Sequence, residues 1–265
     1  MYTHLPQKVV LCRGIGCFTN GSGQKLQWQE NSVILSSRPF GENFKIVTAF
    51  NRSHGKVSGL LKGTKIAPQA GDISDILWRG RSAEQLGIFK IENIFSPFAC
   101  VFNDSIGIFA LESVCFICSG GLPEKAPHPK LFDSLKTLLL SIPQQNWLVN
   151  YAIFEVNFLS EIGFGLSLSK CAVSGETEDL RYISPKTGCA VTGKVGEKYK
   201  DRLFSLPRFL ISASESPTAE DVFASLKITG HFLDIYFHGI NNRGLPPSRK
   251  YLAAETIKKA SGDRA

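Results

Sequence analysis

The spacing of hydrophobic residues changes near Pro97, and this change constrains the fold more than any other feature of the sequence. Over residues 28–94, short segments alternate apolar and polar residues, a pattern that predicts half-buried strands. From Phe98 onward, apolar residues recur at helical spacing. The sequence therefore predicts an α+β protein of more than one domain, with a strand-rich part followed by a helical part.

Five strands are predicted in the first part, and tight turns such as Ser53-His54-Gly55-Lys56 separate them. Their expected ranges are residues 32–40, 44–50, 56–62, 73–81 and 86–94. Five short strands in so short a segment fit a five-stranded barrel of the OB type, with an SH3-like barrel as the structural competitor. We therefore expect residues 26–97 to form an OB-fold domain.

The second part, residues 98–265, is predicted to form a helical domain. Its expected helices cover residues 98–118, 129–141, 146–162, 218–237 and 247–260. Residues 166–208 are rich in loop-forming residues, so we expect them to form a turn-rich insert within the helical domain.

Residues 1–25 fit neither pattern. Gly14, Gly16, Gly21 and Gly23 would interrupt a helix or a strand, and the segment has the composition of a linker. We expect a disordered tail, or a start of translation that is misassigned, with Leu26 as the alternative start.

A short motif occurs twice in the predicted insert. Cys171-Ala-Val-Ser174-Gly returns as Cys189-Ala-Val-Thr192-Gly, with the spacing of a zinc-knuckle pair in which each second cysteine is replaced. A structural zinc site needs four ligands, and serine and threonine hydroxyls replace thiolates poorly. We therefore interpret the pair as degenerate zinc knuckles, and expect neither a metal nor any other cofactor.

Basic residues concentrate in the strand-rich part. Residues 1–97 carry a net charge of +6 and residues 98–265 a net charge of +1. Six cations of the strand region stand against the single acid Glu42: Arg38, Lys45, Arg52, Lys56, Lys62 and Lys65. An OB barrel binds single strands with a cationic groove and aromatic platforms, for which Phe44, Phe50 and Trp78 are candidates if they are not core residues. We expect this part to bind nucleic acid.

A second basic cluster lies in the predicted insert. Its members are Lys186, Lys194, Lys198, Lys200, Arg202 and Arg208, with Glu197 and Asp201 among them. The cluster is a possible secondary DNA contact, and a solvated loop is the alternative interpretation.

Several functional classes find no support in the sequence. The motifs of P-loop nucleotide-binding proteins, zinc metalloproteases and serine hydrolases are missing, so we do not expect an enzyme. Cys115-x-x-Cys118 lies in an apolar helical segment without basic neighbours, where packing explains it best. The seven cysteines do not suggest a disulfide framework, which favours a reducing cytoplasm. No apolar run is long enough to predict a membrane span.

Several segments together resemble the RecO family of bacterial DNA repair and recombination-mediator proteins, most closely its alphaproteobacterial branch. They are residues 41–48 (GENFKIVT), 54–56 (HGK), 62–63 (KG), 161–168 (EIGFGLSL) leading to Cys171, 182–188 (YISPKTG), 199–203 (YKDRL) and 230–233 (GHFL). The resemblance extends from about Gln27 to the C-terminus. The sequence departs from the zinc-bearing members at Ser174 and Thr192.

The resemblance implies an N-terminal OB fold and a helical C-terminal domain. It implies binding to single- and double-stranded DNA and annealing of complementary strands. It also implies contact with RecR and with the C-terminal tail of single-strand-binding protein, and through these contacts help in loading RecA. It also implies a cytoplasmic, nucleoid-associated protein. On this basis we expect Arg79 and Arg81 to join the six cations above in neutralising phosphates. An OB-fold RNA-binding or translation-associated module remains the alternative, and a zinc-dependent enzyme would require bound metal.

Overall fold

Five strands form the N-terminal part of the computed structural model, which describes residues 26–63, 67–82, 85–144, 146–212, 217–242 and 244–260. They are β1 (Leu26–Phe40), β2 (Phe44–Asn51), β3 (Gly55–Lys62), β4 (Ile73–Gly80) and β5 (Gly87–Phe95). The five predicted strands are confirmed to within one residue at most ends. The expectation for residues 1–25 and the predicted site residue Lys65 lie outside the described residues.

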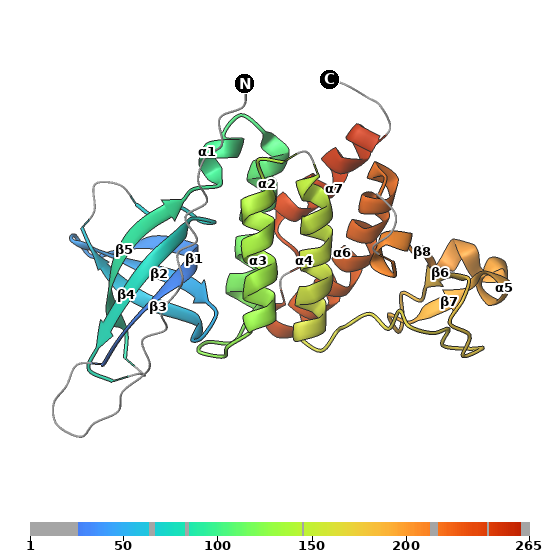
Figure 1. Ribbon diagram of the computed structural model, residues 1–265, viewed down its shortest axis with the longest axis horizontal. Coiled ribbons are helices and arrows are strands. Elements are labelled where there is room, and N and C mark those ends of the chain that lie inside the picture. The colour runs from blue at the N-terminus through green and yellow to red at the C-terminus, as the bar shows by residue number, and fades with distance from the viewer. Residues whose placement is uncertain are drawn as a thin grey trace, which may run out of the picture.

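The strands pair in a ring to form a barrel (Figure 1). β1 pairs with β2 through its C-terminal half and with β4 through its N-terminal half, while β3 pairs with β5 in parallel. This arrangement fits the OB type. β1 begins six residues earlier than the pattern predicted, because Trp28 faces Trp78 across the β1–β4 pair. The barrel interior contains Ile34, Val47, Ala49, Val57, Leu61, Ile76, Trp78 and Phe89.

The helical part follows directly. Its helices are α1 (Phe98–Val101), α2 (Ser105–Gly121), α3 (Pro129–Ser141), α4 (Trp147–Glu161), α6 (Ala219–Asn241) and α7 (Pro247–Ala260). The single helix predicted over residues 98–118 is wrong, because the chain leaves helical geometry at Asp104. The Asp104 side chain accepts a hydrogen bond from the Ile106 N–H, which begins α2 as a separate, capped helix.

Helix α7 is attached to the bundle by a buried ion pair. The Arg249 guanidinium donates from Nε to Glu155 Oε1 at 2.6 Å and from Nη2 to Glu155 Oε2 at 2.8 Å. Nη2 also donates to the Leu226 carbonyl, so one side chain of α7 binds α4 and α6 together. Both charged groups are almost fully buried, and their mutual pairing offsets the cost of removing them from water.

The outside of the barrel packs against the helical bundle in a second hydrophobic core, separate from the barrel interior. Val33, Leu35, Phe50 and Ile73 of the barrel belong to the same buried cluster as the inner residues of α2, α3, α4 and α6. Phe50 meets Phe132 of α3 edge to face, with ring centroids 5.7 Å apart. The outer surface of β2 near Phe50 is therefore covered by protein.

The β2–β3 turn also contacts the helical part through its backbone. The Lys125 N–H donates to the Lys56 carbonyl at 2.8 Å. Gly55 adopts a φ of 71°, and a Cβ atom there would lie 2.0 Å from the Ala126 carbonyl oxygen. Glycine is required at this position for both its conformation and its size.

The insert contains more regular structure than predicted. Three short strands, β6 (Leu180–Ile183), β7 (Ala190–Thr192) and β8 (Phe204–Ser205), form a small sheet. The short helical segments α5 (Gly193–Gly196), η1 (Glu197–Arg202) and η2 (Arg208–Leu210) surround it. Sequence periodicity could not predict this sheet, because strands of two to four residues leave almost no periodic signal. Figure 1 places the insert at one end of the molecule and the barrel at the other.

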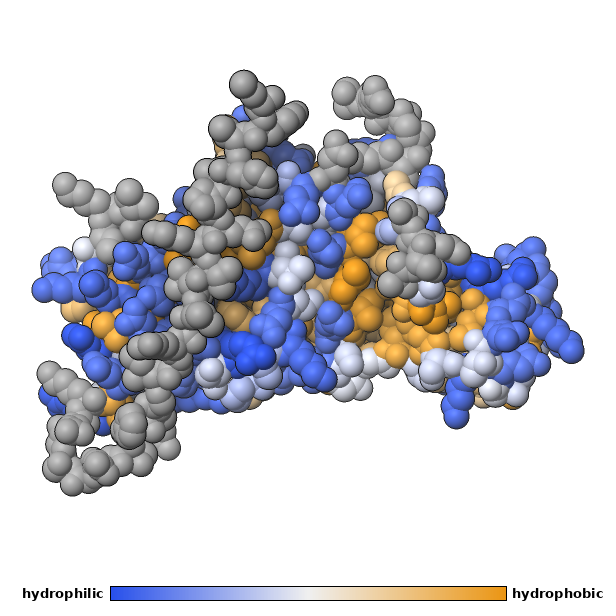
Figure 2. Space-filling view, in the orientation of Figure 1, coloured by the Kyte–Doolittle hydropathy of each residue, from blue (hydrophilic) through white to orange (hydrophobic). Residues whose placement is uncertain are grey.

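Hydrophilic residues dominate the surface of the barrel and the tip of the insert, whereas hydrophobic residues gather over the helical bundle beside the insert (Figure 2). Among the described residues, no helix combines the length and the apolar composition needed to cross a membrane.

Candidate nucleic-acid interface

A row of five residues crosses the outside of the barrel. Register pairs Arg38 with Ile46, Ile46 with Leu60, Leu60 with Ile88, and Ile88 with Arg79. Paired residues of neighbouring strands lie on the same face of a sheet, so this cross-strand row spans β1, β2, β3, β5 and β4. Both arginines are exposed, and Ile88 is 56 % exposed. The row therefore offers two cations separated by an apolar strip.

Further cations lie beside the cross-strand row. Lys62 pairs with Phe44 two residues beyond Leu60, and Lys90 pairs with Leu77 two residues beyond Ile88. Because side chains alternate along a strand, both lysines lie on the same outer face as the row. Phe40, the partner of Phe44 on β1, is 51 % exposed.

We call the cross-strand row together with Lys62 and Lys90 the barrel face. Lys90 was missed by the sequence reasoning, although the alternation of exposed Ile88, Lys90 and Glu92 with Phe89 and Ile91 contains the signal. The acids Asp75 and Glu92 pair with each other further along β4 and β5. They mark the limit of the cationic area in that direction.

Lys56 does not belong to the barrel face. Its ammonium donates to the Ser119 carbonyl of α2 at 2.7 Å and lies 3.5 Å from Glu124 Oε1, and its side chain is only 10 % exposed. The expectation that Lys56 contacts phosphate is corrected for this reason: the helical part covers that end of β3. The Lys56 side chain joins the two parts of the molecule instead.

Two other predicted cations lie away from the barrel face. Arg52 is exposed but donates from Nε to both oxygens of Asp133 on α3, at 3.2 and 3.3 Å. Lys45 is half-buried and shares its side of the sheet with the core residues Val47 and Leu61. Arg81 is exposed just beyond the end of β4.

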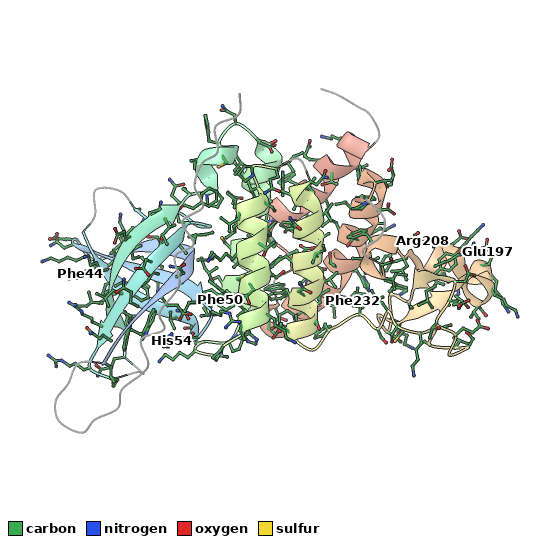
Figure 3. All side chains as sticks on the ribbon, in the orientation of Figure 1. Phe44, Phe50, His54, Glu197, Arg208 and Phe232 are labelled. Atoms are coloured by element: carbon green, nitrogen blue, oxygen red, sulfur yellow. The ribbon has the colours of Figure 1, made fainter. Side chains whose placement is uncertain are left out.

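The three aromatic candidates also differ in whether they are buried or accessible to a ligand. Phe50 is fully buried at the junction with α3, and Trp78 is 5 % exposed inside the barrel, so both are core residues. Phe44 remains half-exposed beside Lys62, at the outer end of the barrel in Figure 3. Of the three, only Phe44 is placed to meet a ligand at the barrel face.

The second basic cluster lies far from the barrel face. Lys186, Lys194, Lys198, Lys200 and Arg202 are all exposed on the insert, and Arg208 lies beside them. Lys200 lies 3.5 Å from Glu197, while Lys198 lies over the Tyr199 ring. Figure 3 shows Glu197 and Arg208 at the opposite end of the molecule from Phe44, with the helical bundle between them. A continuous path between the two clusters would have to cross the bundle.

The two copies of the repeated Cys-Ala-Val-Ser/Thr-Gly motif direct hydrogen-bond donors at one sulfur, that of Cys171. The backbone N–H groups of Ser174 and Thr192 each lie 3.5 Å from the Cys171 sulfur, and Thr192 Oγ1 donates to the same sulfur. Burial raises the pKa of the Cys171 thiol, but hydrogen bonds from the Ser174 side chain and from the backbone N–H groups of Ser174, Thr192 and Val173 outweigh it and lower the pKa to about 6. This lowered pKa favours the thiolate at neutral pH, with hydrogen-bond donors from both turns around the sulfur.

This donor set does not fit zinc. Ser174 and Thr192 stand where the second and fourth thiolates would be needed, and their hydroxyls donate hydrogen bonds to Glu176 and to the Cys171 sulfur respectively, so neither is placed as an anionic ligand. Within the described residues, no group of three or more His, Cys, Asp or Glu side chains converges as metal ligands would.

The Cys115 and Cys118 thiols are suited to packing rather than to chemistry. Both are buried in α2, and burial raises the pKa of the Cys115 thiol to about 12. A thiol with so high a pKa is a poor nucleophile at neutral pH.

Comparison with known proteins agrees with this architecture. Residues 25–98 match the family model "Recombination protein O N terminal", and residues 104–243 match "Recombination protein O C terminal". The DNA repair protein RecO of Phenylobacterium zucineum is 37 % identical over 233 residues, covering 86 % of this chain and 96 % of that protein. The RecO proteins of Rhodospirillum centenum and Anaplasma marginale are 35 % and 39 % identical, covering 84 % and 78 % of this chain and 92 % and 90 % of their own lengths.

Proposed function

Because this chain belongs to the RecO family of DNA repair proteins, we propose that its barrel face binds the phosphates of single- and double-stranded DNA. The observation that carries the proposal is the cross-strand row, in which Arg38 and Arg79 flank an apolar strip. A cationic groove with apolar and aromatic platforms is the general means by which OB folds hold single strands. Lys62 and Lys90 extend the positive area on one side of the strip, because both lie two residues beyond the row on the parallel strands β3 and β5.

Strand annealing follows from this binding mode. Two DNA strands repel each other through their phosphates, and cations that neutralise part of this charge allow complementary bases to meet. We infer that the protein anneals complementary strands and acts as a recombination mediator, without a chemical step of its own. Its partners in this role are RecR, the C-terminal tail of single-strand-binding protein and, indirectly, RecA.

Contact with protein partners is assigned to the helical part and the insert, since the barrel face is committed to DNA. The hydrophobic area over the bundle in Figure 2 is a surface suited to such contact. The exposed cations of the insert, Lys186, Lys194, Lys198, Lys200 and Arg202, supply a secondary contact for DNA or for an acidic partner. We place the protein in the bacterial cytoplasm, at the nucleoid.

An annealing assay tests the proposal. Complementary strands are coated with single-strand-binding protein, and formation of the duplex is followed by fluorescence after the purified protein is added. We expect annealing well above the rate without the protein. A rate equal to the uncatalysed one would contradict the mediator role.

A competition between DNA and RNA strands of one sequence separates the proposal from an OB-fold RNA-binding module. Comparable binding, or a preference for DNA, agrees with a repair role. A strong preference for RNA would instead support the RNA-binding alternative.

A further inference from the structure

Three aromatic rings form a stack that begins inside the barrel and ends at its surface. Trp78 and Trp28 are stacked with their ring centroids 5.9 Å apart and their planes inclined by 11°. The His54 ring continues the stack beyond Trp28, at 4.4 Å and 15°. Trp78 is buried, Trp28 is half-buried, and the His54 side chain is 35 % exposed. Exposure therefore increases along the stack toward solvent.

The outermost ring is held in place from several directions. His54 Nδ1 lies 3.2 Å from Glu30 Oε2, and the Ser53 hydroxyl fixes the same carboxylate through Oε1 at 2.9 Å. The backbone N–H of His54 donates to Asn51 Oδ1 at 2.7 Å. These contacts orient the ring by one edge, and among the described residues His54 Nε2 has no partner. A preorganised ring loses little conformational freedom when a ligand stacks on it.

This arrangement exceeds what a barrel core requires. A hydrophobic side chain at position 54 would cover Trp28 without a hydrogen bond to a carboxylate to orient it. A flat ring that is rigidly held, stacked on one face and partly open to solvent has the form of a platform for another flat ring.

We propose that His54 is a stacking platform for one unpaired nucleobase, which extends the series Trp78, Trp28, His54 by a fourth ring. The proposal rests on the proposed function, since it assumes that the barrel binds nucleic acid. Arg79 follows Trp78 directly on β4 and exposed Arg81 lies two residues further, so cations for the flanking phosphates lie on the strand that pairs with Trp28.

The platform would discriminate between forms of DNA. Each base inside a duplex is covered by a neighbour on both faces, so only an unpaired base, or one at an open end, can stack on His54. The stack therefore adds affinity for single strands that phosphate contacts alone do not supply. Figure 3 shows His54 at the end of the barrel close to the helical part, away from Phe44.

Two oligonucleotides of equal length and charge test the platform. One consists of deoxyadenosine, and the other carries abasic sites throughout, so that it presents phosphates without bases. For His54→Ala in the full-length chain we expect an approximately tenfold loss of affinity for the deoxyadenosine strand and no loss for the abasic strand. His54→Phe, which restores a flat ring, should recover most of the lost affinity.

His238→Ala is the matched control, because His238 is an exposed histidine on α6 and outside the barrel. Equal losses on both strands, or no loss on either, would overturn the stacking platform while DNA binding itself survived. Failure of the unmodified protein to bind either strand would instead overturn the proposed function. Recovery with His54→Phe excludes misfolding as the cause of the loss in His54→Ala.

Discussion

Lys56 and Lys62 lie on the same strand and on the same side of it, yet their surroundings differ completely. Alternation along β3 places both side chains outward, since the inward positions are Val57, Gly59 and Leu61. The helical part covers the strand at Lys56 and leaves it open at Lys62. Sequence periodicity predicts the side of the strand correctly but cannot predict which end another domain will cover.

Replacing these two lysines should therefore give opposite results. Lys56→Ala removes a charged, partly buried hydrogen bond to the Ser119 carbonyl, which typically costs about 1.5–3 kcal/mol, and should lower the melting temperature. Lys62→Ala should leave the melting temperature unchanged and weaken binding to single-stranded DNA. Thermal denaturation and fluorescence anisotropy provide the two measurements. An unchanged melting temperature in Lys56→Ala would contradict the structural role of this side chain.

Cys171 links the stability of the insert to pH. Its pKa is about 6 in the folded protein, below the ordinary thiol value near 9 that it has when unfolded. At pH values below 6 the thiol is protonated in both states, so the hydrogen bonds to a thiolate contribute nothing. As the pH rises from 6 to 9, only the folded state holds the thiolate, and its contribution to stability increases. Above pH 9 the contribution is fully present.

Cys171→Ser should remove this pH dependence. We expect the difference in free energy of unfolding between the unmodified protein and the variant to be larger at pH 8.5 than at pH 6, when measured by urea denaturation under reducing conditions. Cys189→Ser is the control, because the Cys189 sulfur donates to the Thr187 carbonyl instead of accepting backbone N–H bonds. A difference that stays the same at both pH values would contradict the thiolate assignment.

At the scale of elements, the strands and most helices follow from the sequence because their periodicity is long and regular. The ranges of α3 and α7 were predicted to the residue. The break between α1 and α2 was not predicted, because the apolar pattern continues on both sides of Asp104 while this residue ends one helix and caps the next. The cross-strand row was also beyond prediction. It depends on register, and a shift of one residue moves every side chain to the other face.

Helix α7 owes much of its attachment to one pair of charges, Arg249 and Glu155. Arg249→Met should destabilise the protein by about 3–5 kcal/mol, because it leaves the Glu155 carboxylate buried without a countercharge, although the Thr229 hydroxyl still donates to it. A second change, Glu155→Met, should restore much of this loss, since both buried charges are then absent. Chemical denaturation of the two variants measures the effect. A double variant no more stable than Arg249→Met would contradict this account of the pair.

At the scale of the whole molecule, the proposed function places the main DNA contact on the barrel and partner contact on the helical bundle and the insert. Residues on the outside of the barrel belong to the core of the helical bundle, and the insert projects from the far side of that bundle (Figure 1). The concentration of basic residues before Pro97 predicts that the barrel binds DNA. It could not predict that Lys56 and Arg52 contact the bundle, because such contacts join residues that are distant in the sequence.

The central claim is that the barrel face binds DNA through its cations, and its most direct test is the salt dependence of binding to single strands. Each phosphate contact contributes about 0.7 to the slope of log affinity against log salt concentration. The double variant Arg38→Ala, Arg79→Ala should therefore show a slope smaller by about 1.4 than that of the unmodified protein. Lys258→Ala, which removes an exposed cation of α7, should leave the slope unchanged. An unchanged slope in the double variant would contradict the assignment of DNA binding to the barrel face.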